Sequence, residues 1–224
     1  MNCPKCGQPL NPGGVFCGNC GTATSEAKPE SAGQGDRLNG LAVQAWRVLL
    51  AAFLNPVENL FPNYERLTKQ EVLGVGFAFA VLFDLCAVFG IYRMLPHWAG
   101  GPGIAVILKI LLFGFVPTAA LAGAGFLARK VFRATGGTIE SDVFIAGISL
   151  VPTAILLLLS GVLGISNPEV TGLVSVVATS YTILTLFTAC TRISGIAIVR
   201  AVPAVPIILL VTAWLSKVVF AAML

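Results

Sequence analysis

The chain has 224 residues, of which 56% are hydrophobic and only 11% are charged, and its formal net charge is +4. Soluble domains carry about 25% charged residues, so this composition excludes an ordinary soluble domain and predicts an integral membrane protein. The 14 lysines and arginines are scattered rather than clustered, so we expect the lipid bilayer, and no nucleic acid, as a partner.

Residues 1–22 contain two cysteine pairs with the spacing of metal ligands. Cys3 and Cys6 form one C-x2-C pair, Cys17 and Cys20 form another, and ten residues separate the pairs. Four thiolates in this pattern suit tetrahedral Zn2+, with two disulfides or bound iron as alternatives. About 20 residues cannot build a hydrophobic core, so the metal would supply the folding free energy. We expect a zinc ribbon whose zinc is structural, because all four ligand positions are filled.

The next two segments predict a tether and an amphipathic helix. Residues 23–37 are rich in Ser, Gly, Ala, Pro and charge without apolar periodicity, which is typical of a flexible linker. In the following segment, residues 38–71, apolar residues recur at helical spacing from Leu38 to Leu54, and Asn55-Pro56 then breaks the pattern.

This predicted helix is a little short to span a membrane. A position in the cytoplasmic interface suits it, with Trp46 at headgroup depth and Arg47 facing lipid phosphates. Packing against the membrane bundle is the alternative.

The remaining residues, 72–224, predict a five-helix transmembrane bundle. The first apolar segment would reach about 36 Å as a helix, whereas the hydrocarbon core of a bilayer is about 30 Å thick. Short connectors leave no room for a soluble domain between the spans. We expect an all-α membrane fold with spans at about 72–95, 104–128, 143–163, 170–191 and 202–224.

Lysines and arginines predict the orientation of these spans. The connectors at 96–103 and 164–169 contain none. By the positive-inside rule, the N-terminus is cytoplasmic and the C-terminus is outside, in a multi-pass protein of the cell membrane. The residues that define the cytoplasmic side are Arg66, Lys69, Arg129, Lys130, Arg133, Arg192 and Arg200.

Two ionisable residues lie inside the predicted spans. Asp84 is in mid-span, where an aspartate costs about 2.5–3.5 kcal/mol on insertion scales. Lys109 of the second span differs from it by about 7 Å along the membrane normal, within reach of a lysine side chain. A structural ion pair is one interpretation, and a proton or ion pathway is the other. The fourth span carries hydroxyls that suit either helix packing or the lining of such a pathway, at Thr171, Ser175, Thr179 and Thr182.

Three local patterns occur from about Trp46 onward. They are Leu54-Asn55-Pro56 running to Phe61, Gly136-Gly137-Thr138 running to Ser149-Leu150-Val151-Pro152, and Ile193-Ser194-Gly195-Ile196 with Arg200-Ala201. With the five-span plan, these patterns resemble the Yip family of Ypt-interacting membrane proteins over roughly four-fifths of the chain. A zinc ribbon ahead of such a domain looks like the prokaryotic versions. Eukaryotic members are implicated in vesicle trafficking and the binding of small GTPases, a role that we do not extend to this chain.

The functional hypotheses follow from where polar groups occur. No nucleophile–base constellation, paired carboxylates or phosphate loop is present, and the resemblance offers no catalytic residues, so we expect no enzymatic activity. The leading hypothesis is a membrane scaffold or adaptor whose ribbon or interfacial helix recruits a cytoplasmic protein partner. The alternative is a small transporter or channel component that uses Asp84, Lys109 and the hydroxyls of the fourth span.

Overall fold

The computed structural model describes residue 6 and residues 34–94, 104–163 and 168–223. Within those ranges the secondary structure is helical, with no strand. The chain divides into two units, Met1–Gly40 and Leu41–Leu224. Most of the predicted zinc ribbon and linker lies outside the described residues.

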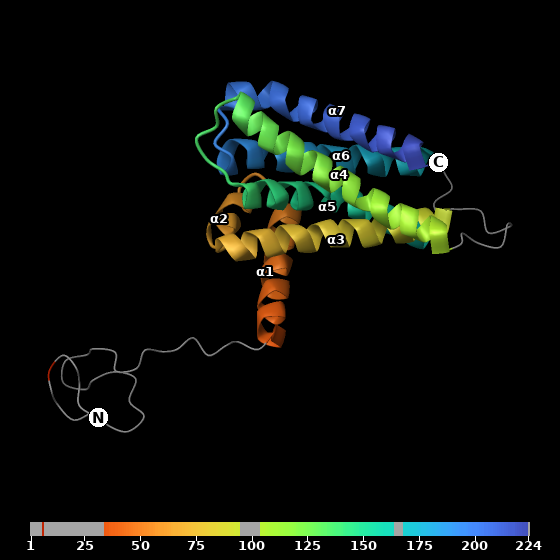
Figure 1. The fold of residues 1–224 in the computed structure, drawn as a ribbon, viewed down its shortest axis with the longest axis horizontal. Coiled ribbons are helices and arrows are strands. Elements are labelled where there is room, and N and C mark those ends of the chain that lie inside the picture. The colour runs from red at the N-terminus through yellow and green to blue at the C-terminus, as the bar shows by residue number, and fades with distance from the viewer. Residues whose placement is uncertain (1–5, 7–33, 95–103, 164–167, 224) are drawn as a thin grey trace. The chain divides into compact units, whose positions relative to one another are not determined.

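The larger unit contains five helices that are long and apolar enough to cross a membrane. They lie along one another in Figure 1. This confirms the predicted all-α fold and its five apolar helices, which fit a multi-pass membrane protein. The helices are α3 (Lys69–Met94), α4 (Ile104–Val131), α5 (Ile139–Leu163), α6 (Pro168–Thr188) with its π-helical continuation η2 (Ala189–Ile193), and α7 (Ile198–Met223).

Among the helices that begin earlier than hydropathy predicts, α3 and α5 have polar residues that cap their starts. Before α3, the Thr68 N–H donates to Glu71 Oε2 at 2.8 Å, and the Glu71 N–H donates to Thr68 Oγ1 at 3.4 Å. Before α5, the Thr138 N–H donates to Ser141 Oγ at 2.8 Å, and the Ser141 N–H donates to Thr138 Oγ1 at 3.3 Å. Such reciprocal bonds satisfy backbone donors that a helix start leaves without partners.

Glycines allow α3 and α5 to pack with their backbones in contact. A Cβ on Gly76 would come within 2.6 Å of Phe144 Cα, and a Cβ on Gly161 would come within 3.0 Å of Gly90 Cα. A Cβ on Gly147 would overlap the Gly76 carbonyl oxygen. Close approach through small residues is a principal source of helix association in lipid. The α3–α5 pair, which makes the most extensive helix contact in the larger unit, is therefore its packing centre.

The five long helices expose many large apolar side chains on their outer faces. Leu112 is 64% exposed, Leu173 71% and Leu210 70%. Apolar surface of this extent is unusual for a protein surrounded by water and suits contact with lipid tails. The buried core lies between the helices, with Phe144 and Leu60 fully enclosed.

Two shorter helices precede the bundle. Helix α1 (Gln34–Leu54) ends directly before Asn55-Pro56, and α2 (Leu60–Glu65) follows. From Leu41 onward, α1 runs crosswise to the five long helices (Figure 1). On this part Val48 is buried, whereas Trp46 is 61% exposed. Helix α1 begins at Gln34, inside the segment predicted as a linker. Once a helix has formed, each further residue adds one backbone hydrogen bond, so the helix can extend into polar residues that show no apolar periodicity.

Side-chain contacts hold α1 against the bundle. Gln44 Nε2 donates to Glu71 Oε1 at 2.6 Å, which ties α1 to the first turn of α3. Near the end of α1, the Phe53 ring stacks on Tyr181 of α6 with the ring centroids 6.0 Å apart. The apolar face of α1 therefore packs on the bundle, as the alternative interpretation of this segment proposed, while Trp46 and Arg47 stay exposed.

Candidate functional site

Arg129 and Asp142 form an ion pair where the chain turns from α4 into α5. Arg129 Nε donates to Asp142 Oδ1 at 2.8 Å, and its Nη2 donates to Asp142 Oδ2. The third nitrogen, Nη1, donates to the Gly137 carbonyl at 3.0 Å. A planar guanidinium bonded in this two-pronged way fixes orientation as well as charge. Arg129 was expected on the cytoplasmic side, but its partner Asp142 was not predicted.

The turn between α4 and α5 also contacts the turn between η2 and α7. The Gly136 N–H donates to the Ser194 carbonyl at 3.2 Å, and Thr135 Oγ1 donates to the Gly195 carbonyl at 3.4 Å. Gly137 and Gly195 have φ angles of 81° and 68°, a left-handed conformation that favours glycine. Two of the three local patterns noted in the sequence therefore meet in space. We call Arg129, Asp142 and residues 135–137 and 194–195 the arginine junction.

Helix α2 packs beside the arginine junction through Tyr64. The Tyr64 ring lies 5.4 Å from the Phe144 ring, centroid to centroid. Burial raises the pKa of Tyr64, and its side-chain hydrogen bond with Ser141 acts in the opposite direction. Since Ser141 also caps α5, one buried hydroxyl joins α2 to the start of α5.

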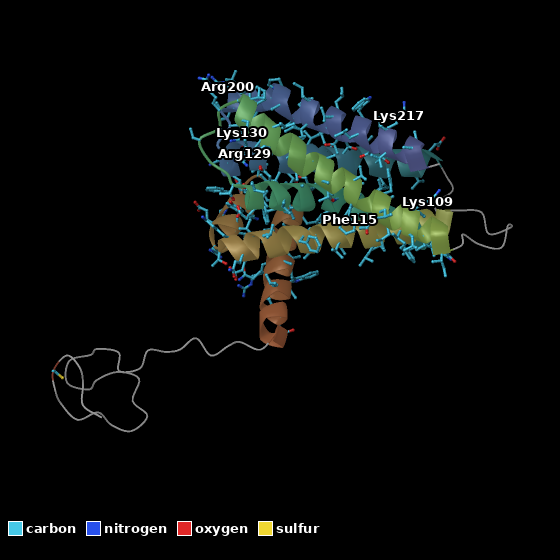
Figure 2. The ribbon with its side chains drawn as sticks, in the orientation of Figure 1. Lys109, Phe115, Arg129, Lys130, Arg200 and Lys217 are labelled. Atoms are coloured by element: carbon cyan, nitrogen blue, oxygen red, sulfur yellow. The ribbon has the colours of Figure 1, made fainter. Side chains whose placement is uncertain are left out.

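Exposed cations surround the arginine junction at this end of the bundle, where α2 lies. Figure 2 shows Arg129, Lys130 and Arg200 at this end and Lys109 and Lys217 at the opposite end. Arg200 Nη1 donates to the Phe132 carbonyl at 2.9 Å and so braces the end of α4. We call the exposed set the basic rim, and it consists of Arg66, Lys69, Lys130, Arg133, Arg192 and Arg200.

Asp84 is buried in the middle of α3, with 3% of its surface exposed. Its Oδ1 atom has no hydrogen-bond partner in the described part of the chain. The carboxylate lies against Gly114 of α4, where an added Cβ would overlap Oδ1. Lys109 is exposed on α4, more than one helical turn from Gly114. The Asp84–Lys109 ion pair stays a prediction.

The hydroxyls of the fourth predicted span occupy different environments. Thr182 is buried, and its Oγ1 donates to the Ala178 carbonyl of its own helix at 3.0 Å. Thr179 is exposed and Ser175 is half-buried, while the side chain of Thr171 lies outside the described residues. Because these hydroxyls differ in exposure, their positions favour a role in helix packing over the lining of a continuous polar pathway.

Of the four predicted zinc ligands, only Cys6 belongs to the described residues, and it is exposed. Cys3, Cys17 and Cys20 lie outside them, so the zinc ribbon stays a prediction. Cys86 and Cys190 are buried in the bundle core. No protein-family model, curated protein or solved structure matches this chain.

Proposed function

We propose that this protein is a non-enzymatic scaffold or adaptor of the cell membrane, with its N-terminus in the cytoplasm. The observation that carries the proposal is the position of the basic rim. Its six cations gather at the end of the bundle that contains α2, which supports a cytoplasmic position for that end by the positive-inside rule. With this orientation of the spans, the N-terminal segment that contains the proposed zinc ribbon would face the cytoplasm.

Two further features support an adaptor. The ion pair of Arg129 with Asp142 is used within the fold, so the exposed cations of the rim are the groups left for a partner or for lipid phosphates. The crosswise direction of α1, with Trp46 and Arg47 exposed, supports a position along the membrane interface. The resemblance to Yip-type proteins is in keeping with a multi-span interaction protein.

The test is recovery of partners by crosslinking and affinity purification from membranes. Deletion of residues 1–36 should leave membrane insertion intact and abolish partner recovery. Cys17→Ser should do the same, because it removes a proposed zinc ligand. Asn19→Ser is the matched control within the same cysteine pair and should keep the partners. Recovery of the same partners by the deleted protein would show that the ribbon is not the recruiting element.

The second candidate function is a transporter or channel component. The observation that favours it is the buried Asp84 carboxylate, whose Oδ1 has no hydrogen-bond partner in the described structure. Ionisable groups in this position are often functional in membrane proteins. A flux assay in proteoliposomes that compares wild type with Asp84→Asn tests it, and equal flux in both would exclude a pathway through Asp84.

A further inference from the structure

Four buried side-chain oxygens have no hydrogen-bond partner in the described part of the chain, and three of them lie in α3, α4 and α5. They are Asp84 Oδ1, Thr118 Oγ1 and Ser149 Oγ, on residues with 3%, 7% and 0% exposure. Buried polar groups are nearly always hydrogen-bonded, because loss of water without a replacement is unfavourable. The three atoms lie on helices that pack against one another.

Helix register places two of these atoms on one interface. Near the arginine junction, a Cβ on Gly125 would lie 3.8 Å from Asp142 Oδ1, so these residues face each other across α4 and α5. The two helices are antiparallel neighbours along the chain. Thr118 is seven residues before Gly125, and Ser149 is seven residues after Asp142. Seven residues are close to two helical turns, so ideal helical periodicity places Thr118 and Ser149 on these same sides of α4 and α5, two turns further from the arginine junction.

The third atom, Asp84 Oδ1, lies next to Gly114 on α4. Gly114 is one turn from Thr118 on the same face of α4, a separation of about 6 Å along the helix axis. The Asp84 carboxylate fills the space that the missing Gly114 side chain leaves. The Phe77 ring of α3 stacks on the Phe115 ring of α4 with the ring centroids 6.5 Å apart. A polar site thus lies within apolar surroundings.

We propose that Asp84 and Thr118 bind a partly hydrated sodium ion between α3 and α4, with Ser149 holding water of its shell. Carboxylate, hydroxyl and water oxygens are the ligands that hard cations take. A single positive charge balances the single carboxylate, whereas a divalent ion would leave a net charge in an apolar environment. The site is independent of the adaptor role and does not require transport.

The test uses the purified full-length protein in detergent micelles. Its thermal midpoint Tm should rise with sodium chloride that replaces choline chloride at constant ionic strength, because sodium binds the folded state. Asp84→Asn should remove this rise. Gly114→Ala should remove it as well, since its methyl group takes the place of the carboxylate. Gly123→Ala is the matched control on the same helix, because a Cβ there meets no atom within 4 Å.

Two further variants test which side chains belong to the sodium site. Thr118→Val, which keeps the side-chain volume, should raise the apparent sodium dissociation constant about tenfold, as expected for one lost oxygen ligand. Lys109→Met should leave the sodium response unchanged. Wild type should bind one radioactive sodium ion per chain. This measurement tests the site without a variant, in case Asp84→Asn does not fold. A wild-type Tm that is insensitive to sodium, an equal response in Asp84→Asn, or loss of the response in Lys109→Met would each overturn the proposal.

Discussion

Arg129 in the last turn of α4 and Asp142 in the first turn of α5 are joined by two charge-assisted hydrogen bonds. Their side chains are 13% and 3% exposed, so the pair is buried where the chain reverses direction. A third bond from Arg129 reaches the Gly137 carbonyl and ties the pair to the turn itself. The arrangement therefore sets how α4 and α5 meet, and loss of one partner would leave the other charge buried alone.

We predict that Arg129→Met lowers the free energy of unfolding by about 3–5 kcal/mol, as is usual when one partner of a buried pair is removed. The double variant Arg129→Met, Asp142→Leu should lose clearly less than the single variant, since no isolated charge remains. Unfolding in mixed micelles measures both. Lys130→Met, at the exposed neighbouring position, is the control and should change stability little. Equal losses in Arg129→Met and Lys130→Met would contradict the buried pair.

A second prediction concerns the contact between α3 and α5. Gly147→Ala should destabilise the bundle by about 1–3 kcal/mol, because the new methyl group would overlap the Gly76 carbonyl and backbone cannot yield as a side chain can. Gly123→Ala, with open space around it, should be neutral or stabilising by up to about 1 kcal/mol. Thermal unfolding of the two variants side by side measures the difference. If Gly147→Ala is as stable as Gly123→Ala, the helices do not pack through glycine.

The five long helices were predictable because their apolar composition is nearly uniform over the length of a span. Their starts were less predictable, since the Thr68–Glu71 and Thr138–Ser141 caps consist of polar residues that hydropathy assigns to connectors. A search for Ser or Thr followed three residues later by Glu or Ser would have found both helix starts.

The arginine junction was not predicted, because its contacts join residues far apart in the sequence. Gly136 bonds to Ser194, and no local pattern specifies that pairing. The available signal was an arginine that ends one span, a Gly-Gly turn, and an aspartate that starts the next span. The packing of Asp84 against Gly114 was likewise not predicted, since the sequence does not show which residue a glycine inside an apolar span faces.

A third prediction concerns the metal. Cys3, Cys6, Cys17 and Cys20 should bind one zinc ion per chain, measured by elemental analysis of the purified full-length protein. Cys17→Ser should lose the zinc, because tetrahedral structural sites need all four ligands. Cys86→Ala is the control, since that cysteine is buried in the bundle. Zinc retained at full stoichiometry in Cys17→Ser would exclude this ligand set, and intact disulfides in its place would favour the disulfide alternative.

A fourth prediction separates the ion pair inferred from the sequence from the proposed sodium site. In a double-mutant cycle of Asp84→Asn and Lys109→Met, the effects on unfolding free energy should add within about 0.5 kcal/mol if the residues do not interact. The sodium site requires this additivity, because Lys109 takes no part in it. A double variant that is markedly milder than the sum of the single variants would instead establish the ion pair.

The last prediction is the orientation of the five spans. The six residues of the basic rim and Arg129 lie around one end of the bundle, so we expect that end to face the cytoplasm. Cysteines introduced at Gly100 and Asn167, in the connectors without Lys or Arg, should react with an impermeant thiol reagent in intact cells. A cysteine at Thr135, an exposed residue of the arginine junction, should react only after the membrane is permeabilised. The unmodified chain measures the background from the native cysteines, of which Cys6 is exposed whereas Cys86 and Cys190 are buried. Reaction at Thr135 in intact cells, with none at Gly100 or Asn167, would mean that the protein is inserted the other way round and that its ribbon meets partners outside the cell.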